Sequence, residues 1–198
     1  MTADIVLAST SSYRRALLAR VLPRFEAVAP GVEESPRPGE PPARLALRLA
    51  RAKARAVAAL RPGAVVIGSD QVAELDGAAL GKPGGADRAR AQLLACAGRS
   101  VRFHTAVCVI GADGRGRSAR DLTRVRFLPL SPAWIDAYLD RERPFDCAGS
   151  FKAEALGIAL FEAIHSRDPT ALVGLPLIAT CRLLRAAGIE PLTAAGAG

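Results

Sequence analysis

Hydrophobic and polar residues follow two patterns along this chain, one typical of buried strands and the other of amphipathic helices. Short apolar runs at residues 5–8 and 64–69 predict strands that are covered on both faces. Apolar residues recur at helical spacing in residues 13–22 and 43–60, so each of these segments predicts a helix. Residues 30–42 are rich in proline, glycine and glutamate and predict a loop.

The second half of the chain continues this alternation. Asp76 and Gly77 stand between short apolar segments, which is a signal for a tight hairpin. The predicted strands are residues 101–110, 118–128 and 156–164, the predicted helices are residues 87–97, 131–141 and 174–187, and residues 193–198 are expected to be frayed. This order predicts an α/β fold with some antiparallel pairing. A length of 198 residues suits one domain or two tightly joined lobes.

Composition narrows the class of protein. Half of the residues are hydrophobic, which is enough for a large core. No apolar stretch approaches the ~20 residues of a membrane span, and the N-terminus lacks the basic and apolar regions of a signal peptide. The cysteines have no CxxC spacing, so we expect free thiols and no zinc at Cys96, Cys108, Cys147 and Cys181. We therefore expect a cytoplasmic protein without a membrane partner.

The net charge of +8 is compatible with nucleic acids and with phosphorylated small molecules, because a positive field attracts both. The arginines are spread from Arg14 to Arg185, and no run of basic residues alternates with stacking aromatic residues. We therefore expect no stable nucleic-acid partner.

Only three of the 27 basic residues are lysines, namely Lys53, Lys82 and Lys152. This chain uses arginine wherever either cation would serve. Each lysine therefore marks a candidate position where a compact ammonium is needed instead of a flat guanidinium. The alternative is that the three lysines are remnants of a coding bias.

The first chemical pattern is LASTSSYRR, where a strand runs into hydroxyl residues and the start of a helix. Backbone N–H groups at a helix N-terminus favour an anion, and arginine can bind phosphate oxygens with paired donors. Arg14 and Arg15 in the first turn oppose the helix dipole unless an anion compensates. The pattern indicates a phosphate site, and the alternative is a plain capped helix with exposed arginines.

The second pattern is GSDQ followed by LGKP. Asp70 stands at the predicted end of a buried strand, which is where α/β folds bind their ligands. A carboxylate there can bind a divalent metal or accept a proton from water, and the hairpin can fold Lys82 back toward it. A strand-end aspartate that makes only turn hydrogen bonds is also common.

Two further segments carry candidate ligands. Glu33 in the loop GVEE could supply a second metal carboxylate, although loop glutamates are usually solvated. In CAGSFKAEALG, small residues let the backbone approach a ligand beside Lys152 and Glu154. No Ser-His-Asp or Cys-His pattern is visible, and we expect His104 and His165 to be structural.

Together these segments resemble the Maf family of nucleotide pyrophosphatases, from Ile5 to Pro191. The shared motifs are LASTSSYRR, GVEE, the helix around Lys53, IGSDQV, LGKP, AGSFKAE and RDPTALVGLPL. The resemblance implies an elongated Maf/ITPase-like α/β fold, with a central mixed sheet flanked by helices and two lobes around a cleft, in a single domain of residues 1–198. It also implies hydrolysis of a nucleoside triphosphate to the monophosphate and pyrophosphate with a divalent metal, Mg²⁺ or Mn²⁺.

The resemblance implies roles for individual residues. Asp70 matches the catalytic carboxylate, as general base or metal ligand, and Glu33 matches an acidic position of the metal site. The phosphate-handling positions are Ser9, Arg14, Arg15, Lys53 and Lys82, with Lys82 also expected to act in catalysis and Lys152 to bind substrate. Attack on the α-phosphorus develops charge on phosphoryl oxygens, which fixed cations and a metal stabilise.

Three positions in the family are associated with base choice, and here they hold Tyr13, Gln71 and Glu154. Members that act on thymidine and uridine triphosphates typically carry Arg, Thr and Gln there. An aromatic residue, Gln and Glu resemble the 7-methyl-GTP pyrophosphatase subfamily, although Tyr13 stands where tryptophan is expected. A tyrosine still offers an aromatic face to a cationic base.

We therefore expect hydrolysis of 7-methyl-GTP to 7-methyl-GMP and pyrophosphate, which would remove modified nucleotides. One alternative is dTTP, UTP or another nucleotide in the same reaction class. Another is a nucleotide-binding regulator of cell division, a role historically attached to the family. A homodimer is compatible with the sequence, which does not determine the oligomeric state.

Overall fold

A mixed sheet runs through the molecule, of which the computed structural model describes residues 4–193. Its strands are β1 (Ile5–Ala8), β2 (Glu26–Val28), β3 (Val65–Leu75), β4 (Ala78–Leu80), β5 (Ser100–Ile110), β6 (Gly116–Phe127) and β7 (Phe161–His165). They lie in the order β2-β1-β3-β5-β6-β7, and β4 pairs with β3. β1 runs parallel to β2 and β3, whereas the other pairs are antiparallel. The predicted central mixed sheet is confirmed.

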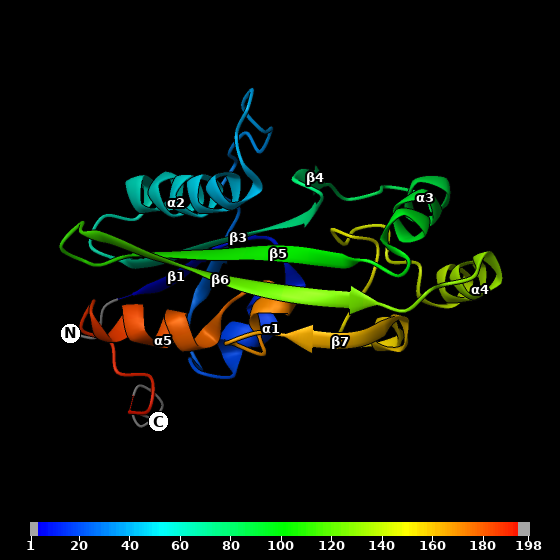
Figure 1. Ribbon diagram of the computed structural model, residues 1–198. Coiled ribbons are helices and arrows are strands. Elements are labelled where there is room, and N and C mark those ends of the chain that lie inside the picture. The colour runs from blue at the N-terminus through cyan, green and yellow to red at the C-terminus, as the bar shows by residue number, and fades with distance from the viewer. Residues whose placement is uncertain (1–3, 194–198) are drawn as a thin grey trace.

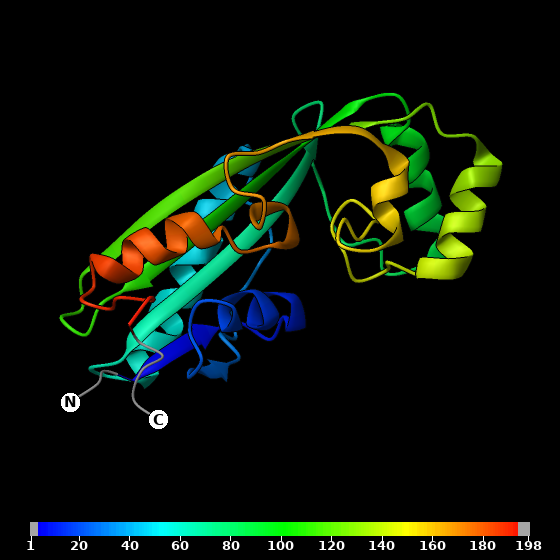
Figure 2. The same cartoon turned by 90° about the horizontal axis from the view of Figure 1, so that it is seen from below.

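The helices gather around the two ends of this sheet (Figure 1). At one end α2 (Pro42–Leu60) covers one face, and α1 (Ser12–Ala19) and α5 (Leu177–Arg185) cover the other. At the other end lie α3 (Ala86–Cys96), α4 (Pro132–Glu142) and the 3-10 helix η1 (Leu156–Leu160). Figure 2 shows the long strands passing from the first group to the second. No helix within residues 4–193 is long and apolar enough to cross a membrane.

Separate clusters of buried side chains hold the helices on the sheet. One joins α2 to β3 and β5, and another joins α1 and α5 to the opposite face of the same strands. A third joins α3 and α4 to the far ends of β3, β5 and β6. Each end of the sheet, together with its helices, forms one lobe. Since β3, β5 and β6 contribute to the cores of both lobes, we propose that the lobes form one domain.

Strand β3 is longer than predicted, and this changes the position of Asp70. The prediction ended the strand at Ser69, where polar residues interrupt the apolar run, but β3 continues to Leu75 beside β5. Its parallel neighbour β1 stops at Ala8, which pairs with Gly68. Asp70 therefore stands within β3, just past the point where β1 leaves the sheet, and the prediction of a strand end was wrong.

Other boundaries also differ from the sequence prediction. The prediction of a strand over residues 156–164 is wrong for residues 156–160, because these form the 3-10 helix η1. Gly157 lies so close to the Lys152 backbone there that a Cβ would stand 2.4 Å from the carbonyl oxygen. The last helix begins at Leu177 and not at Gly174, since Gly174 has a φ of +119° and Pro176 disfavours a helical conformation in the residue before it.

The remaining predicted helices and strands are confirmed, with their ends shifted by a few residues. The predicted hairpin at residues 76–77 is also confirmed. Strand β2 was not predicted. The tail predicted to be frayed lies, beyond Thr193, outside the described residues.

The contact between α2 and β3 yields a first prediction. A Cβ on Gly68 would stand 2.4 Å from the Ala50 carbonyl oxygen and 2.6 Å from the Ala54 nitrogen. Backbone atoms cannot rotate away, so Gly68→Ala should push α2 off the sheet and lower the free energy of unfolding by about 3 kcal/mol in urea denaturation. The control is Gly81→Ala, where no atom lies within 4 Å, and it should change stability by less than about 1 kcal/mol. Equal stability of the two variants would contradict this close approach.

Candidate active site

A cavity of about 820 Å³ opens between the two lobes. Its walls come from the segment after β1, the loop before α2, the middle of β3, the β4 region, the segment after α4, and the short 3-10 helix η2 (Ala171–Val173). Most of the predicted site residues line it, namely Ser9, Tyr13, Arg14, Lys53, Asp70, Gln71, Lys82 and Glu154. The fold thus brings four distant sequence motifs to one cavity.

A buried ion pair joins α2 to β3 in the wall of this cavity. Lys53 Nζ lies 2.7 Å from Asp70 Oδ1, and their side chains are 6% and 8% exposed. Lys53 reaches Asp70 from the apolar side of α2, where its neighbours Ala50 and Ala54 are fully buried. Burial raises the pKa of Asp70, although the charges of Lys53 and Arg14 act to lower it. A carboxylate in such a position is suited to accept a proton from water.

Glu34 is a second carboxylate on the same lysine. Its Oε1 lies 2.6 Å from Lys53 Nζ, and its side chain is 57% exposed. Arg48 on α2 anchors the loop that carries it, because the guanidinium binds both carboxylate oxygens of Glu40 at 2.7 Å and the Ser35 carbonyl oxygen at 3.0 Å. Lys53 is therefore held between two carboxylates from different segments.

The first turn of α1 supplies the predicted anion-binding elements. Ser11 caps the helix by accepting a hydrogen bond from the Arg14 backbone nitrogen, and Ser9 is buried behind it. Arg14 Nε donates to the Gly174 carbonyl oxygen at 2.9 Å. Burial lowers the pKa of Arg14, while the nearby carboxylates of Asp70 and Glu34 raise it. This guanidinium therefore adds positive charge next to the buried pair.

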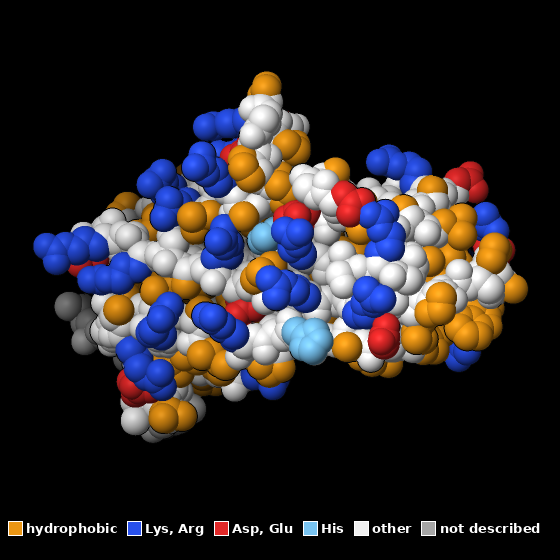
Figure 3. Space-filling view, viewed as in Figure 1, with side chains coloured by type: hydrophobic (Ala, Val, Ile, Leu, Met, Phe, Trp, Pro, Cys, Tyr) orange, Lys and Arg blue, Asp and Glu red, His pale blue; other side chains and the backbone are white. Residues whose placement is uncertain are grey.

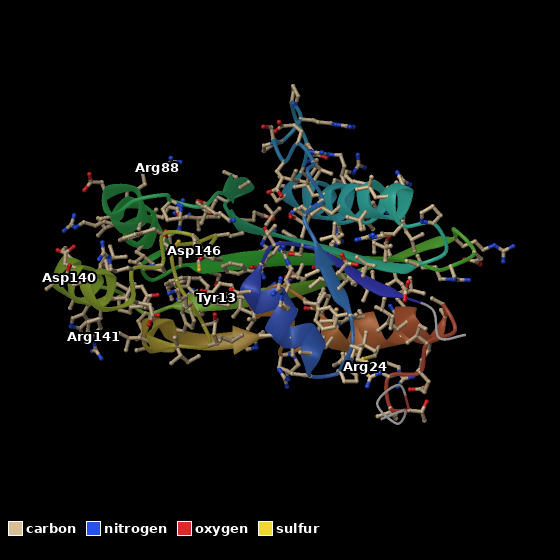
Figure 4. The ribbon with its side chains drawn as sticks, turned by 180° about the vertical axis from the view of Figure 1, so that it is seen from behind. Tyr13, Arg24, Arg88, Asp140, Arg141 and Asp146 are labelled. Carbon is tan, nitrogen blue, oxygen red and sulfur yellow. The ribbon has the colours of Figure 1, made fainter. Side chains whose placement is uncertain are left out.

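Lys82 follows β4 and lies exposed in the cavity lining. The side chain has no carboxylate partner among residues 4–193, so its ammonium is available to a ligand. Figure 3 shows lysine and arginine side chains, with few acidic side chains among them, on the face formed by α2, β5 and β6, which lies away from the side that shows Tyr13 in Figure 4. The positive field of such a protein attracts polyphosphates.

The opposite wall is built on Phe151 from the second lobe. Its ring packs edge-to-face against three other phenylalanines, at centroid distances of 5.3 Å to Phe103, 5.7 Å to Phe127 and 4.8 Å to Phe161. The backbone before it is sharply turned, with left-handed φ values at Gly149 and Ser150. This buried anchor directs the flanking residues 146–148 and 153–154 to the cavity.

Tyr13 and Glu154 line the cavity from opposite lobes. Figure 4 shows Tyr13 at the start of α1, beside the loop that carries Asp146. Burial, together with Cys147 and Asp146, raises the pKa of Tyr13 to about 12, so its phenol stays protonated at neutral pH. Glu154 is exposed and has no hydrogen bond or ion pair within the described part of the chain. Both groups are free to contact a ligand.

Three predicted site residues are not brought to the cavity. Arg15 is exposed on α1 and does not line it. Glu33 is also exposed, and its carboxylate accepts a hydrogen bond from the Ser35 backbone nitrogen at 2.8 Å. Lys152 points toward α4, where its Nζ lies 3.4 Å from Glu142 Oε1. Glu34, which was not predicted as a site residue, lines the cavity beside Lys53, whereas its neighbour Glu33 does not line it.

The residues present fit a divalent cation that binds together with a polyphosphate. No cluster of three or more His, Cys, Asp or Glu side chains that could hold a metal occurs within residues 4–193. Mg²⁺ is usually bound by one or two carboxylates, with substrate phosphates and water as its other ligands. Asp70 and Glu34 supply such a pair of carboxylates.

Comparison with known proteins agrees with the motifs. The model of the family described as Maf-like protein matches residues 4–187. The chain is 61% identical over 190 residues to a protein named 7-methyl-GTP pyrophosphatase from Xanthomonas oryzae pv. oryzae (strain KACC10331 / KXO85), covering 96% of this chain and 99% of that protein. It is 57% identical to a Bordetella pertussis protein of the same name, covering 96% and 94%.

Among solved structures, the Staphylococcus aureus Ham1 protein aligns with a TM-score of 0.47 at 17% identity, over 64% of this chain and 72% of that chain. The family match spans nearly all of the described residues, and the relatives match along almost their whole length. The chain therefore belongs to the Maf-like protein family.

Proposed function

We propose that this protein hydrolyses 7-methyl-GTP to 7-methyl-GMP and pyrophosphate. The observation that carries the proposal is the buried Lys53–Asp70 pair, which shares one cavity with Tyr13 and Glu154. One wall offers cations and a carboxylate for phosphate chemistry, and the other offers an aromatic face and a carboxylate for a cationic base. The relatives that carry this activity in their names support the choice of substrate.

At the phosphate end, Asp70 accepts a proton from the attacking water, and Lys53, Arg14 and Lys82 stabilise charge on the phosphoryl oxygens. Binding of the triphosphate offers Lys53 a new anionic partner beside its two carboxylates. Asp70 and Glu34 would hold Mg²⁺ or Mn²⁺, which would neutralise phosphate charge when bound. Pyrophosphate leaves from the α-phosphorus as the new oxygen bond forms.

At the base end, methylation at N7 makes the guanine ring cationic. Tyr13 offers its face to this ring, and such a cation–π contact is worth about 0.5–2 kcal/mol depending on desolvation. Glu154 accepts hydrogen bonds from the ring N1–H and the exocyclic amine, and its charge offsets that of the ring. Because Glu154 has no partner within residues 4–193, no internal ion pair competes with the base.

The reaction is tested with purified protein, Mg²⁺ or Mn²⁺, and 7-methyl-GTP. We expect 7-methyl-GMP and pyrophosphate, whereas release of inorganic phosphate and a diphosphate would contradict attack at the α-phosphorus. Asp70→Asn should lower kcat by about 10²–10⁴-fold, because the proton acceptor is lost. Asp140→Asn, a matched change of an exposed aspartate on α4, should leave kcat unchanged.

The two neighbouring glutamates of the GVEE loop provide a matched pair of variants. Glu34→Gln removes the second carboxylate on Lys53, and we expect kcat/KM to fall about 10–100-fold, with a higher metal requirement. Glu33→Gln changes an exposed side chain outside the cavity and should retain activity within about twofold of the unmodified protein. If Glu33→Gln were the more damaging change, the assignment of Glu34 would be wrong.

Base recognition is tested by the ratio of kcat/KM for 7-methyl-GTP to that for UTP. Glu154→Gln should lower this ratio about tenfold, since it replaces a charged acceptor of hydrogen bonds with a neutral one. Glu162→Gln, an exposed glutamate on β7, is the control and should leave the ratio unchanged. An unaltered ratio in Glu154→Gln would remove this residue from base recognition while the pyrophosphatase assignment stood.

A further inference from the structure

Gln71 on β3 is held by its amide nitrogen. Nε2 donates to the carbonyl oxygens of Ala171 at 2.9 Å and Leu172 at 3.0 Å, and to Thr105 Oγ1 at 3.0 Å. Thr105 stands opposite Gln71 on β5, and its own hydroxyl donates to the Ala171 carbonyl oxygen at 2.9 Å. An amide nitrogen has two N–H donors, so these acceptors use its donor capacity completely.

The partners also decide which end of the amide faces the cavity. The two η2 carbonyls can only accept hydrogen bonds, so an amide oxygen turned toward them would place lone pairs against lone pairs. The oxygen Oε1 has no hydrogen-bond partner within residues 4–193, and it is not among the buried unpaired atoms there. Because Gln71 lines the cavity, its amide presents an acceptor to a ligand and no donor.

The carbonyls of η2 are themselves fixed by a buried network. The Asp168 carboxylate, in a residue only 3% exposed, accepts hydrogen bonds from the Thr170 nitrogen at 2.9 Å, the Thr170 hydroxyl at 2.6 Å and the Ile178 nitrogen at 2.7 Å. The Thr170 hydroxyl in turn lies 2.8 Å from the Leu175 carbonyl oxygen. Rotation of the Gln71 amide would therefore require this whole turn to move.

We propose that Thr105 and the η2 carbonyls act as a specificity-positioning element that locks Gln71 with its oxygen toward the base. This inference rests on the proposed function, in which the cavity binds a nucleotide. A locked acceptor selects a base whose edge carries donors. Guanine presents N1–H and an exocyclic 2-amino group, and Glu154 is a further acceptor in the same cavity. Adenine has its amino donor at C6 and presents a bare N1 lone pair, which repels an acceptor, where guanine has N1–H and the adjacent 2-amino group. Hypoxanthine keeps N1–H but lacks the 2-amino group.

The experiment compares kcat/KM for GTP, ITP and ATP, which differ only on this edge of the base. Binding of GTP and ATP is measured in parallel by calorimetry without a divalent metal. For the wild-type protein we expect the order GTP, then ITP, then ATP. Gln71→Met should lower the GTP-to-ATP ratio about tenfold, and Thr105→Val should lower it about threefold. Thr105→Ser restores the hydroxyl and should restore the ratio.

A structural defect would lower kcat/KM for all three nucleotides together. Loss of the fixed Gln71 orientation should instead lower the GTP-to-ATP ratio and leave kcat/KM for ATP unchanged. Thr180→Val is the matched control, because Thr180 is a fully buried threonine of α5 whose hydroxyl donates to the Pro176 carbonyl oxygen at the start of its own helix, outside the cavity. It should leave the ratio unchanged. A ratio that stays at the wild-type value in Thr105→Val would overturn the proposal, even if Gln71→Met lowered it. Equal binding of GTP and ATP by the wild-type protein would overturn it too. Absence of pyrophosphate release from 7-methyl-GTP would instead refute the proposed function. In that case the ratio of the GTP and ATP affinities measured by calorimetry would still decide the role of Gln71.

Discussion

The buried ion pair between Lys53 and Asp70 is the interaction on which the rest of the site depends. Taking two charges out of water costs several kcal/mol per ion, and a close partner for each charge offsets that cost. The two partners belong to different layers, because Asp70 stands on the sheet and Lys53 on the helix that covers it. Gly68 lets those layers approach closely enough for the pair to form. The Asp70 carboxylate and its cation are thus already in place before any ligand binds.

A second consequence of the sheet is that both walls of the cavity share one framework. β3 carries Asp70 and Gln71 in one lobe, and β3 and its neighbour β5 continue into the core that anchors Phe151 in the other. The segment before α5 links two parts of the cavity, because its carbonyls bind both Arg14 and Gln71. In the proposed function, the spacing between phosphate chemistry at Arg14 and base recognition at Gln71 is therefore set by rigid elements, as precise positioning of a substrate requires.

Much of this arrangement could be predicted from the sequence, because local patterns and motif residues report on it directly. The strand and helix order followed from apolar spacing, and the cavity lining includes most residues chosen from the motifs. The differences between the predicted and the observed positions have a common origin in tertiary packing. Glu33 and Glu34 are chemically identical neighbours, and only the path of a loop tied down by Arg48 decides which one reaches Lys53.

Lys152 illustrates the same limit, since its motif indicates a ligand but the helix α4 supplies Glu142 as a nearer partner. The polar residues after Gly68 suggested the end of a strand, although the long pairing with β5 carries β3 onward. The orientation of the Gln71 amide depends on residues about 100 positions away in the chain, so no local pattern could reveal it.

In the proposed reaction, water attacks the α-phosphorus of a nucleotide bound beside Asp70. Hydrolysis of 7-methyl-GTP in water enriched in oxygen-18, followed by mass spectrometry of both products, identifies the phosphorus that is attacked. We expect the heavy oxygen in 7-methyl-GMP and unlabelled pyrophosphate. Label in pyrophosphate would show attack at the β-phosphorus and would rule out this reaction.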